Sequence, residues 1–259
     1  MLKAIAFDLW ETIITNTPDA SHAQKHRRVT AMERVLRARN IETTPEEIDR
    51  AHHESWDRLQ DLYWSRDVDI PCRRQVEHLL EFLDVDPLDE EALAALEDAY
   101  ANAILDHLPS IVDGAVDVLR EMRDRDLRIG LISNTGRTPG SALRDVLAQL
   151  DLAQYFDVML FSNEHGECKP QPSIFGALIE GLGAAPDETV FVGDNLYVDV
   201  YCAQRSGMKG IHFIPPQRGT AIAPHVEHGL EIVADATIHD LRELPLCIET
   251  ISSHFAPST

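Results

Sequence analysis

The sequence opens with MLKAIAFDLWET (residues 1–12), in which the apolar run 2–9 ends among polar residues. An apolar run this short predicts a buried strand. Asp8 lies at the end of this run. Strands that are apolar on both faces are typical of parallel sheets, whose faces are covered by helices. We therefore expect residues 2–9 to form one strand of a sheet that later segments complete.

The next hundred residues have a different pattern. Over residues 20–108, apolar side chains recur at helical spacing. Thr44 followed by Pro45 is typical of a helix start with Thr44 as the N-cap. Residues 16–18 and 109–110 contain prolines, bracket this block and are candidate hinges. The pattern predicts an all-helical domain inserted directly after the first strand.

After residue 110, helices and strands alternate. The predicted strands are 127–133, 158–162, 189–193 and 210–214, and the predicted helices are 114–125, 141–150, 173–182 and 198–206. We expect the tail 230–251 to add a short strand and a last helix, after a proline-containing connection at 215–224. This alternation predicts an α/β fold with a Rossmann-like parallel sheet and helices on both faces. The predicted domains are a core of residues 1–17 and 110–259 and a helical insertion of residues 18–109.

Composition limits the possible functions. The 259 residues carry a formal net charge of −21, so the surface repels nucleic acid and anionic lipid. No apolar run is long enough for a membrane span, and the start does not resemble a secretory signal. The four cysteines are scattered without a CxxC pair, which favours reduced thiols in a cytoplasmic protein. The oligomeric state stays open between a monomer and a homodimer.

Polar residues follow the predicted strands at their carboxyl ends, where ligands of such sheets bind. Asp8 ends the first strand, Ser133 and Asn134 end the second, and Asp194 follows the strand 189–193, with Asp199 five residues later. Carboxylates that meet at one edge repel each other unless a cation lies among them, and oxygen ligands suit magnesium. A lysine nearby, such as Lys169, could neutralise a bound anion or hold two carboxylates together. Taken singly, each of these residues could equally be a cap or a turn residue.

Together, the four segments resemble the signature motifs of the haloacid dehalogenase-like hydrolase superfamily, in the same order and over the whole chain. The segment from Asp8 to Thr12 resembles the nucleophile motif, and residues 132–134 resemble the second motif. Residues 166–175 resemble the lysine motif and the helix after it, and residues 192–199 resemble the acidic metal motif. The helical insertion is similar to the cap domain of this family.

The resemblance implies a role for each matching residue. Asp8 would be a nucleophile that forms a covalent aspartyl intermediate, which water then cleaves. The implied catalytic residues are Asp8, Thr12, Ser133, Asn134 and Lys169, and the implied substrate contacts are Trp10, Ser133, Asn134 and Lys169. The implied ligands of Mg²⁺ are Asp8, the main-chain carbonyl of Trp10, Asp194 and Asp199. The substrate would be a small anionic molecule, and a metal and a lysine suit the negative charge of phosphoryl transfer.

Trp10 departs from the pattern of the family's phosphatases, which carry a second aspartate at this place. Indole has no proton that titrates near neutral pH, and losing a general acid typically costs roughly 10²–10⁴ in rate. Glu11 is the next carboxylate, but its direction does not follow from the sequence. Trp10 could also be a packing residue that walls the pocket.

Three alternatives follow from this departure. Haloacid dehalogenases of the family also lack the second aspartate, and Arg37 or Arg39 could bind the anion, but they need no metal, so Asp194 and Asp199 argue against them. Phosphonate hydrolases of the family use a cap lysine, for which Lys25 is the candidate. The third alternative is a catalytically impaired, magnesium-binding regulatory protein. We expect a magnesium-dependent phosphatase acting on a small phosphorylated metabolite.

Overall fold

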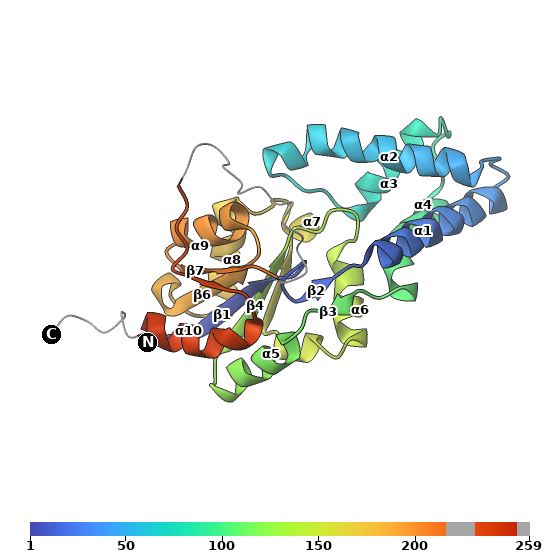
Figure 1. Cartoon of the computed structure of the whole chain (residues 1–259). Helices are drawn as coiled ribbons and strands as arrows, with labels where there is room; N and C mark the ends of the chain where they lie inside the picture. Colours follow the sequence, from blue (N-terminus) through green and yellow to red (C-terminus); the bar gives the residue numbers. More distant parts are fainter. Residues whose placement is uncertain (216–230, 253–259) are drawn as a thin grey trace.

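The computed structural model describes residues 1–215 and 231–252 and is built around a six-stranded sheet (Figure 1). The strand order is β5-β4-β1-β6-β7-β8, and every neighbouring pair is parallel. The strands are β1 Ala4–Asp8, β4 Arg128–Ser133, β5 Val158–Phe161, β6 Thr189–Gly193, β7 Lys209–Phe213 and β8 Ala236–Ile238. The predicted parallel α/β fold is confirmed. Of the predicted connection 215–224, all but the first residue lies outside the described residues.

The sheet is buried on both faces, as the unbroken apolar strands predicted. In β1, Ile5 and Phe7 join one apolar core, whereas Ala4 and Ala6 join a second, smaller one, because successive side chains of a strand point to opposite faces. The first core is covered by α5 Ala115–Asp124, α6 Gly140–Gln149 and α10 Leu244–Ser252. The second is covered by α8 Pro172–Leu182 and α9 Cys202–Arg205. Short helical segments complete the core: η3 Ala153–Tyr155, α7 Ser162–His165, η4 Pro186–Glu188 and η6 Leu241–Glu243.

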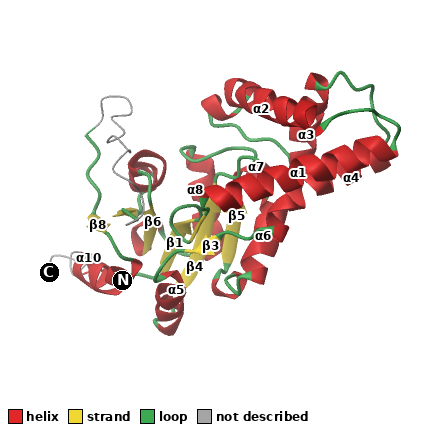
Figure 2. Cartoon of the chain, turned by 45° about the vertical axis from the view of Figure 1, so that its right-hand side comes forward, coloured by secondary structure: helices red, strands yellow, loops and turns green. Residues whose placement is uncertain are grey.

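The segment after β1 is helical and lies beyond one end of the sheet (Figures 1 and 2). Its helices are α1 Pro18–Ala38, α2 Pro45–Leu62, η1 Trp64–Arg66, α3 Cys72–Phe82, α4 Glu90–Ala101 and η2 Asn102–Asp106. The predicted start of α2 is confirmed: the Thr44 hydroxyl accepts from the Glu47 amide, and the Glu47 carboxylate accepts from the Thr44 amide. This capping box satisfies two amides that a helix start otherwise leaves unpaired.

Two very short strands join the two chain segments that connect the helices to the sheet. β2 Ile14–Thr15 pairs antiparallel with β3 Ser110–Ile111. The prolines around these strands mark the predicted hinges, and the pairing of the strands was not predicted. The two connections therefore run together as one ribbon, and a movement of the helical segment must move both.

Some predicted boundaries are wrong. The predicted helix 198–206 begins two residues earlier, as the π-helical segment η5 Leu196–Tyr201, and continues into α9. The first strand is shorter at both ends than the apolar run 2–9. Within residues 1–215 and 231–252, no helix is long and apolar enough to cross a membrane. The four cysteines are unpaired.

Candidate active site

The sheet order brings the predicted site residues to one edge. Asp8 ends β1, Ser133 ends the neighbouring strand β4, and Asp194 directly follows β6 on the other side. Lys169 comes from the connection between α7 and α8, and Asp199 from η5. Because the strands are parallel, their carboxyl ends meet, and five residues from distant parts of the sequence become neighbours.

Three carboxylates share one small space at this edge. One oxygen from each of Asp8, Asp194 and Asp199 lies within 4.8 Å of the other two, and all three residues are buried. The Lys169 ammonium donates to Asp8 Oδ1 at 2.5 Å and to Asp199 Oδ1 at 2.6 Å. One ammonium group against three carboxylates leaves an excess of negative charge. Buried oxygen ligands with such an excess suit a divalent cation of the magnesium type.

The electrostatics of the pair Asp8–Lys169 follow from this arrangement. Burial raises the pKa of the Asp8 carboxyl to about 7; Lys169 opposes this rise, whereas Asp199 and Asp194 add to it. Burial disfavours the charged form of Lys169, but the Asp199 and Asp8 carboxylates outweigh it and raise the pKa of its ammonium group. The lysine therefore stays charged, and a cation beside Asp8 would favour the ionised carboxyl.

The acidic segment after β6 is held by its own backbone. Asn195 accepts from the amides of Tyr197 and Val198 and so caps η5, and its own amide donates to Asp199 Oδ2 at 3.0 Å. Gly193 leaves the room that Asp199 needs, since a Cβ atom there would lie 2.4 Å from Asp199 Cγ. The glycine and the π-helical start thus place the carboxylate beside Lys169.

Asn134 positions the lysine from the other side. Its side-chain amide donates to the Lys169 carbonyl at 2.9 Å, and its side-chain oxygen accepts from the Lys169 amide at 2.8 Å. This reciprocal pair uses both polar atoms of the Asn134 side chain. Ser133 is fully buried, and its hydroxyl donates to the Asn134 carbonyl over a long distance of 3.5 Å.

The residues after Asp8 form a tight turn. The Thr12 hydroxyl donates to Asp8 Oδ2 at 3.4 Å. Glu11 has the left-handed φ of 59°, and its carboxylate accepts from the Thr15 hydroxyl at 2.8 Å. Trp10 forms a bridge with Ile14 and packs partly buried against the core. The Glu11 carboxylate is thus engaged with Thr15.

A cleft of about 590 Å³ lies between this edge and the helical insertion. Trp56, Gln60 and Trp64 line it from the insertion, and Asn134, Lys169 and Tyr197 line it from the sheet side. Neither tryptophan is among the site residues expected from the sequence, and Trp56 is 40% exposed.

The segment 67–69 of the insertion docks on the loop that carries Lys169. The Cys168 amide donates to the Asp67 carbonyl, and the Asp69 amide donates to the Gly166 carbonyl. The buried Asp69 carboxylate accepts four hydrogen bonds; the donors are Trp64 Nε1, the Ile70 amide and the hydroxyls of Thr135 and Ser162. This contact was not predicted, because acidic residues between two helices are typical of any exposed loop.

The family model for haloacid dehalogenase-like hydrolases matches residues 2–207. The chain belongs to this family of hydrolases. Among curated relatives, the glyceraldehyde 3-phosphate phosphatase of Pyrococcus abyssi is 29% identical over 215 residues, which are 82% of each chain. The ribulose-1,5-bisphosphate 5-phosphatase of Halopiger xanaduensis is 32% identical over 165 residues, 64% of this chain and 67% of that protein.

Solved structures of haloacid dehalogenase-like proteins share the fold. The 2-haloacid dehalogenase of Pseudomonas syringae superposes with a TM-score of 0.67 at 24% identity, over 96% of this chain and 99% of that chain. A HAD phosphatase from Thermococcus onnurineus gives a TM-score of 0.60 at 24% identity, over 95% and 98%. At this level of identity, both comparisons show the fold alone.

The cations expected for the alternative hydrolase chemistries lie outside the cleft. Arg37 pairs with Glu33, and Arg39 pairs with Asp89 at 2.7 Å. Lys25 pairs with Asp49 at 2.7 Å. None of the three cations is among the described residues that line the cleft.

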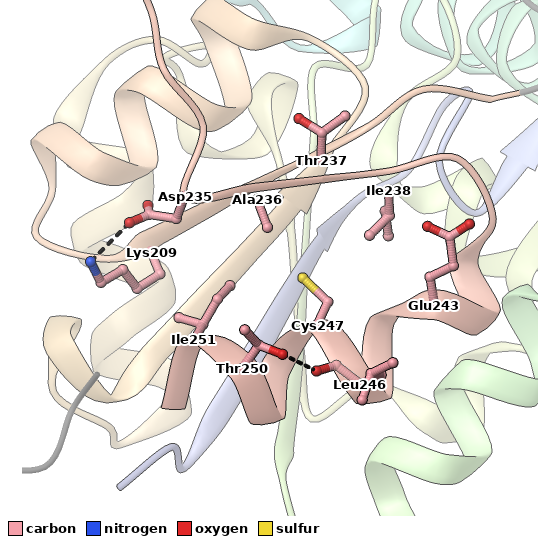
Figure 3. Close-up of a pocket in the computed structure, with 10 residues that line it drawn as sticks. All are labelled: Lys209, Asp235, Ala236, Thr237, Ile238, Glu243, Leu246, Cys247, Thr250 and Ile251. Carbon is pink, nitrogen blue, oxygen red and sulfur yellow. Dashed lines mark hydrogen bonds and ion pairs between the residues drawn. The ribbon is translucent and has the colours of Figure 1, made fainter. Parts of the chain in front are cut away.

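A second hollow of about 680 Å³ lies between β8 and α10 at the sheet edge (Figure 3). Lys209 and Asp235, at the amino ends of β7 and β8, pair with each other at 2.8 Å at one side of it (Figure 3). Cys247, Ile251 and Leu246 supply much of its wall. It holds none of the predicted site residues, and we assign no chemistry to it.

Proposed function

We propose that this hydrolase is a magnesium-dependent phosphatase that uses Asp8 as its nucleophile. The observation that carries the proposal is the buried group of three carboxylates with Lys169 between two of them. A haloacid dehalogenase needs no metal, and the excess negative charge would repel its anionic substrate. The names of the curated relatives, which are phosphatases of small phosphorylated compounds, support the same choice.

Asp8, Asp194 and the main-chain carbonyl of Trp10 would hold Mg²⁺, with Asp199 beside them. Their oxygen donors fit the ion, and Asp199 already receives hydrogen bonds from Lys169 and Asn195, which suits a residue that supports the ligands. When bound, the ion would neutralise charge on the phosphoryl oxygens.

Asp8 would attack phosphorus while the bond between phosphorus and the alcohol oxygen breaks. The alcohol oxygen leaves with the electron pair of that bond and takes a proton from water, and a further water molecule then cleaves the aspartyl phosphate to release inorganic phosphate. Lys169 would keep Asp8 ionised and neutralise phosphoryl oxygens, and the Ser133 hydroxyl would donate to one of them. Thr12 would orient Asp8, and Asn134 would hold Lys169 in place.

We further propose that residues 18–109 act as a cap, that Trp10 stands in the place of the family's general acid, and that the protein works in the cytoplasm. A cap that moves on the paired connections β2 and β3 would open and close the cleft around a small phosphorylated substrate.

The test is phosphate release from 4-nitrophenyl phosphate and from a panel of phosphorylated metabolites, with and without Mg²⁺. We expect release that needs the ion and that is abolished in Asp8→Asn. Asp151→Asn is the matched control, because Asp151 lies exposed on the core surface. Metal-independent halide release from 2-haloacids would overturn the proposal. Absence of both activities in the folded protein would also overturn it and favour a binding protein.

A further inference from the structure

Aromatic side chains line both sides of the cleft that Lys169 also lines. Trp56 and Trp64 have ring centroids 4.6 Å apart, and Tyr197 lines the cleft from η5. The exposed part of Trp56 is unusual for so large an apolar ring, and exposed aromatic surface inside a concave site is typical of ligand contact. The walls therefore favour a planar, apolar group on the ligand.

The charged residues of the cleft favour an uncharged group on the part of the ligand beyond its phosphate. Among its described lining residues, Lys169 is the only lysine or arginine, and its ammonium is bonded to Asp8 and Asp199. Asp67 and Asp69 also line the cleft. The Arg137 guanidinium lies 5.0 Å from the centroid of the Trp56 ring, but it already donates to the Tyr100 hydroxyl and the His52 carbonyl. A second phosphate or a carboxylate on the substrate would therefore meet these acids, while the nearby cations are already paired.

The two side chains that follow Leu9 in the turn after Asp8, Trp10 and Glu11, do not offer a proton to a departing alcohol. Trp10 has no titratable proton, and the Glu11 carboxylate is bonded to Thr15. The Asp69 carboxylate already accepts four hydrogen bonds from protein donors, so it is engaged in the docking contact. Without a proton donor, the rate of departure depends on how well the oxygen carries negative charge.

We propose that the substrate is a phosphate monoester of an uncharged, planar phenol-type alcohol. Phenols ionise at a pH of about 10, as the tyrosine side chain does, so a phenolate departs without a proton from the protein and takes one from water. The bond to phosphorus forms from Asp8 and breaks at the phenolic oxygen. This inference rests on the proposed phosphatase activity and names its substrate class.

The experiment compares phenyl phosphate with benzyl phosphate, which carries the same ring on an aliphatic oxygen. With Mg²⁺ present, we expect kcat/KM to be at least about 10²-fold higher for phenyl phosphate, the lower range of what general acid catalysis contributes. An anionic substituent tests the charge: 3-carboxyphenyl phosphate should be a poorer substrate than 3-carbamoylphenyl phosphate. Asp67→Asn should reduce that difference and leave the preference for phenyl over benzyl phosphate unchanged.

Trp56→Ala tests the contact with the ring. We expect KM for phenyl phosphate to rise roughly 3- to 10-fold with kcat nearly unchanged, and Trp56→Phe to restore most of the loss. If Trp56 had a purely structural role, Trp56→Ala would lower kcat, and the change in KM would not depend on whether an aromatic ring is present at position 56.

The outcomes separate the two proposals. If no ester releases phosphate, the phosphatase proposal itself fails. If benzyl phosphate or glycerol phosphate is hydrolysed as fast as phenyl phosphate, the phosphatase proposal stands and the substrate class is wrong. If Asp67→Asn abolishes hydrolysis of benzyl phosphate alone, Asp67 is a proton donor and the argument from the missing donor is overturned.

Discussion

Removing the charge of Lys169 should destabilise the protein at high pH and make its stability depend on magnesium. Lys169 is 3% exposed, and its ammonium lies 2.5 Å from Asp8 and 2.6 Å from Asp199. Breaking a buried ion pair by removing one partner costs about 3–5 kcal/mol, because the other charge stays buried and unpaired. We expect Lys169→Met to lose about this much unfolding free energy at pH 8 without metal.

The loss should shrink at low pH. The Asp8 carboxyl has a folded-state pKa of about 7, above its ordinary value of 3.8. Protonation of Asp8 therefore stabilises the fold; this stabilisation is complete below pH 3.8 and is lost as the pH rises through about 7. Lys169 lowers this pKa, so in Lys169→Met the Asp8 carboxyl keeps its proton to a still higher pH. The loss of unfolding free energy should therefore be largest at a pH high enough to ionise Asp8.

Urea unfolding followed by circular dichroism, at pH 5 and pH 8 and with or without Mg²⁺, measures these effects. Magnesium at about 100 times its dissociation constant should return about 2.7 kcal/mol. Lys209→Met is the matched control, since Lys209 pairs at the surface with Asp235 and such pairs contribute about 1 kcal/mol or less. If Lys169→Met lost no more than this control at pH 8, our reading of the carboxylate cluster would be refuted.

Three further predictions concern the same edge of the sheet. Apparent magnesium affinity, measured by tryptophan fluorescence, should rise from pH 6 to pH 8 as Asp8 loses its proton, and Asp8→Asn should abolish this dependence. Gly193→Ala should weaken magnesium affinity and phosphate release at least tenfold, because the new Cβ atom would displace the Asp199 carboxylate. Gly176→Ala has no atom near the new Cβ and should leave both intact, so equal effects of the two variants would contradict the packing argument. Asp69→Ala should lower the unfolding free energy, measured in urea, by about 1–3 kcal/mol, because four donors lose their acceptor. A loss under about 0.5 kcal/mol, the size of an ordinary surface substitution, would count against the docking contact.

The parts of the site that could be predicted from the sequence are those fixed by local pattern. Apolar strands that end in Asp8, Ser133 and Asp194 can be recognised singly, and parallel pairing then requires their ends to meet. The helix start at Thr44 was equally local, because a capping box involves only four residues. Neither prediction required knowledge of which other distant segments are in contact.

Contacts between distant loops could not be predicted in this way. The β2–β3 pair joins residues almost a hundred positions apart through strands of two residues each, which are too short for any periodicity. Asp69 became a buried acceptor only because Ser162 and Thr135, from two other connections, meet it. The exposure of Trp56 likewise depends on the cleft that the sheet edge provides, and not on its own helix.

The contacts of residues 67–69 couple the helical insertion to the ion pair. The amides of Cys168 and Asp69 tie this segment to the loop that ends in Lys169, and Ser162, which begins the preceding helical turn, donates to the Asp69 carboxylate. A movement that lifts the insertion from the sheet must break these bonds at one end of the loop, while Asn134 holds the other end. Closure of the cleft and the placement of the Lys169 ammonium between its two carboxylates are therefore parts of one arrangement. A buried acceptor such as Asp69 is costly to leave half satisfied, so the contacts of this segment should form or break together. In the proposed mechanism, this would place Lys169 beside Asp8 whenever the cleft is closed.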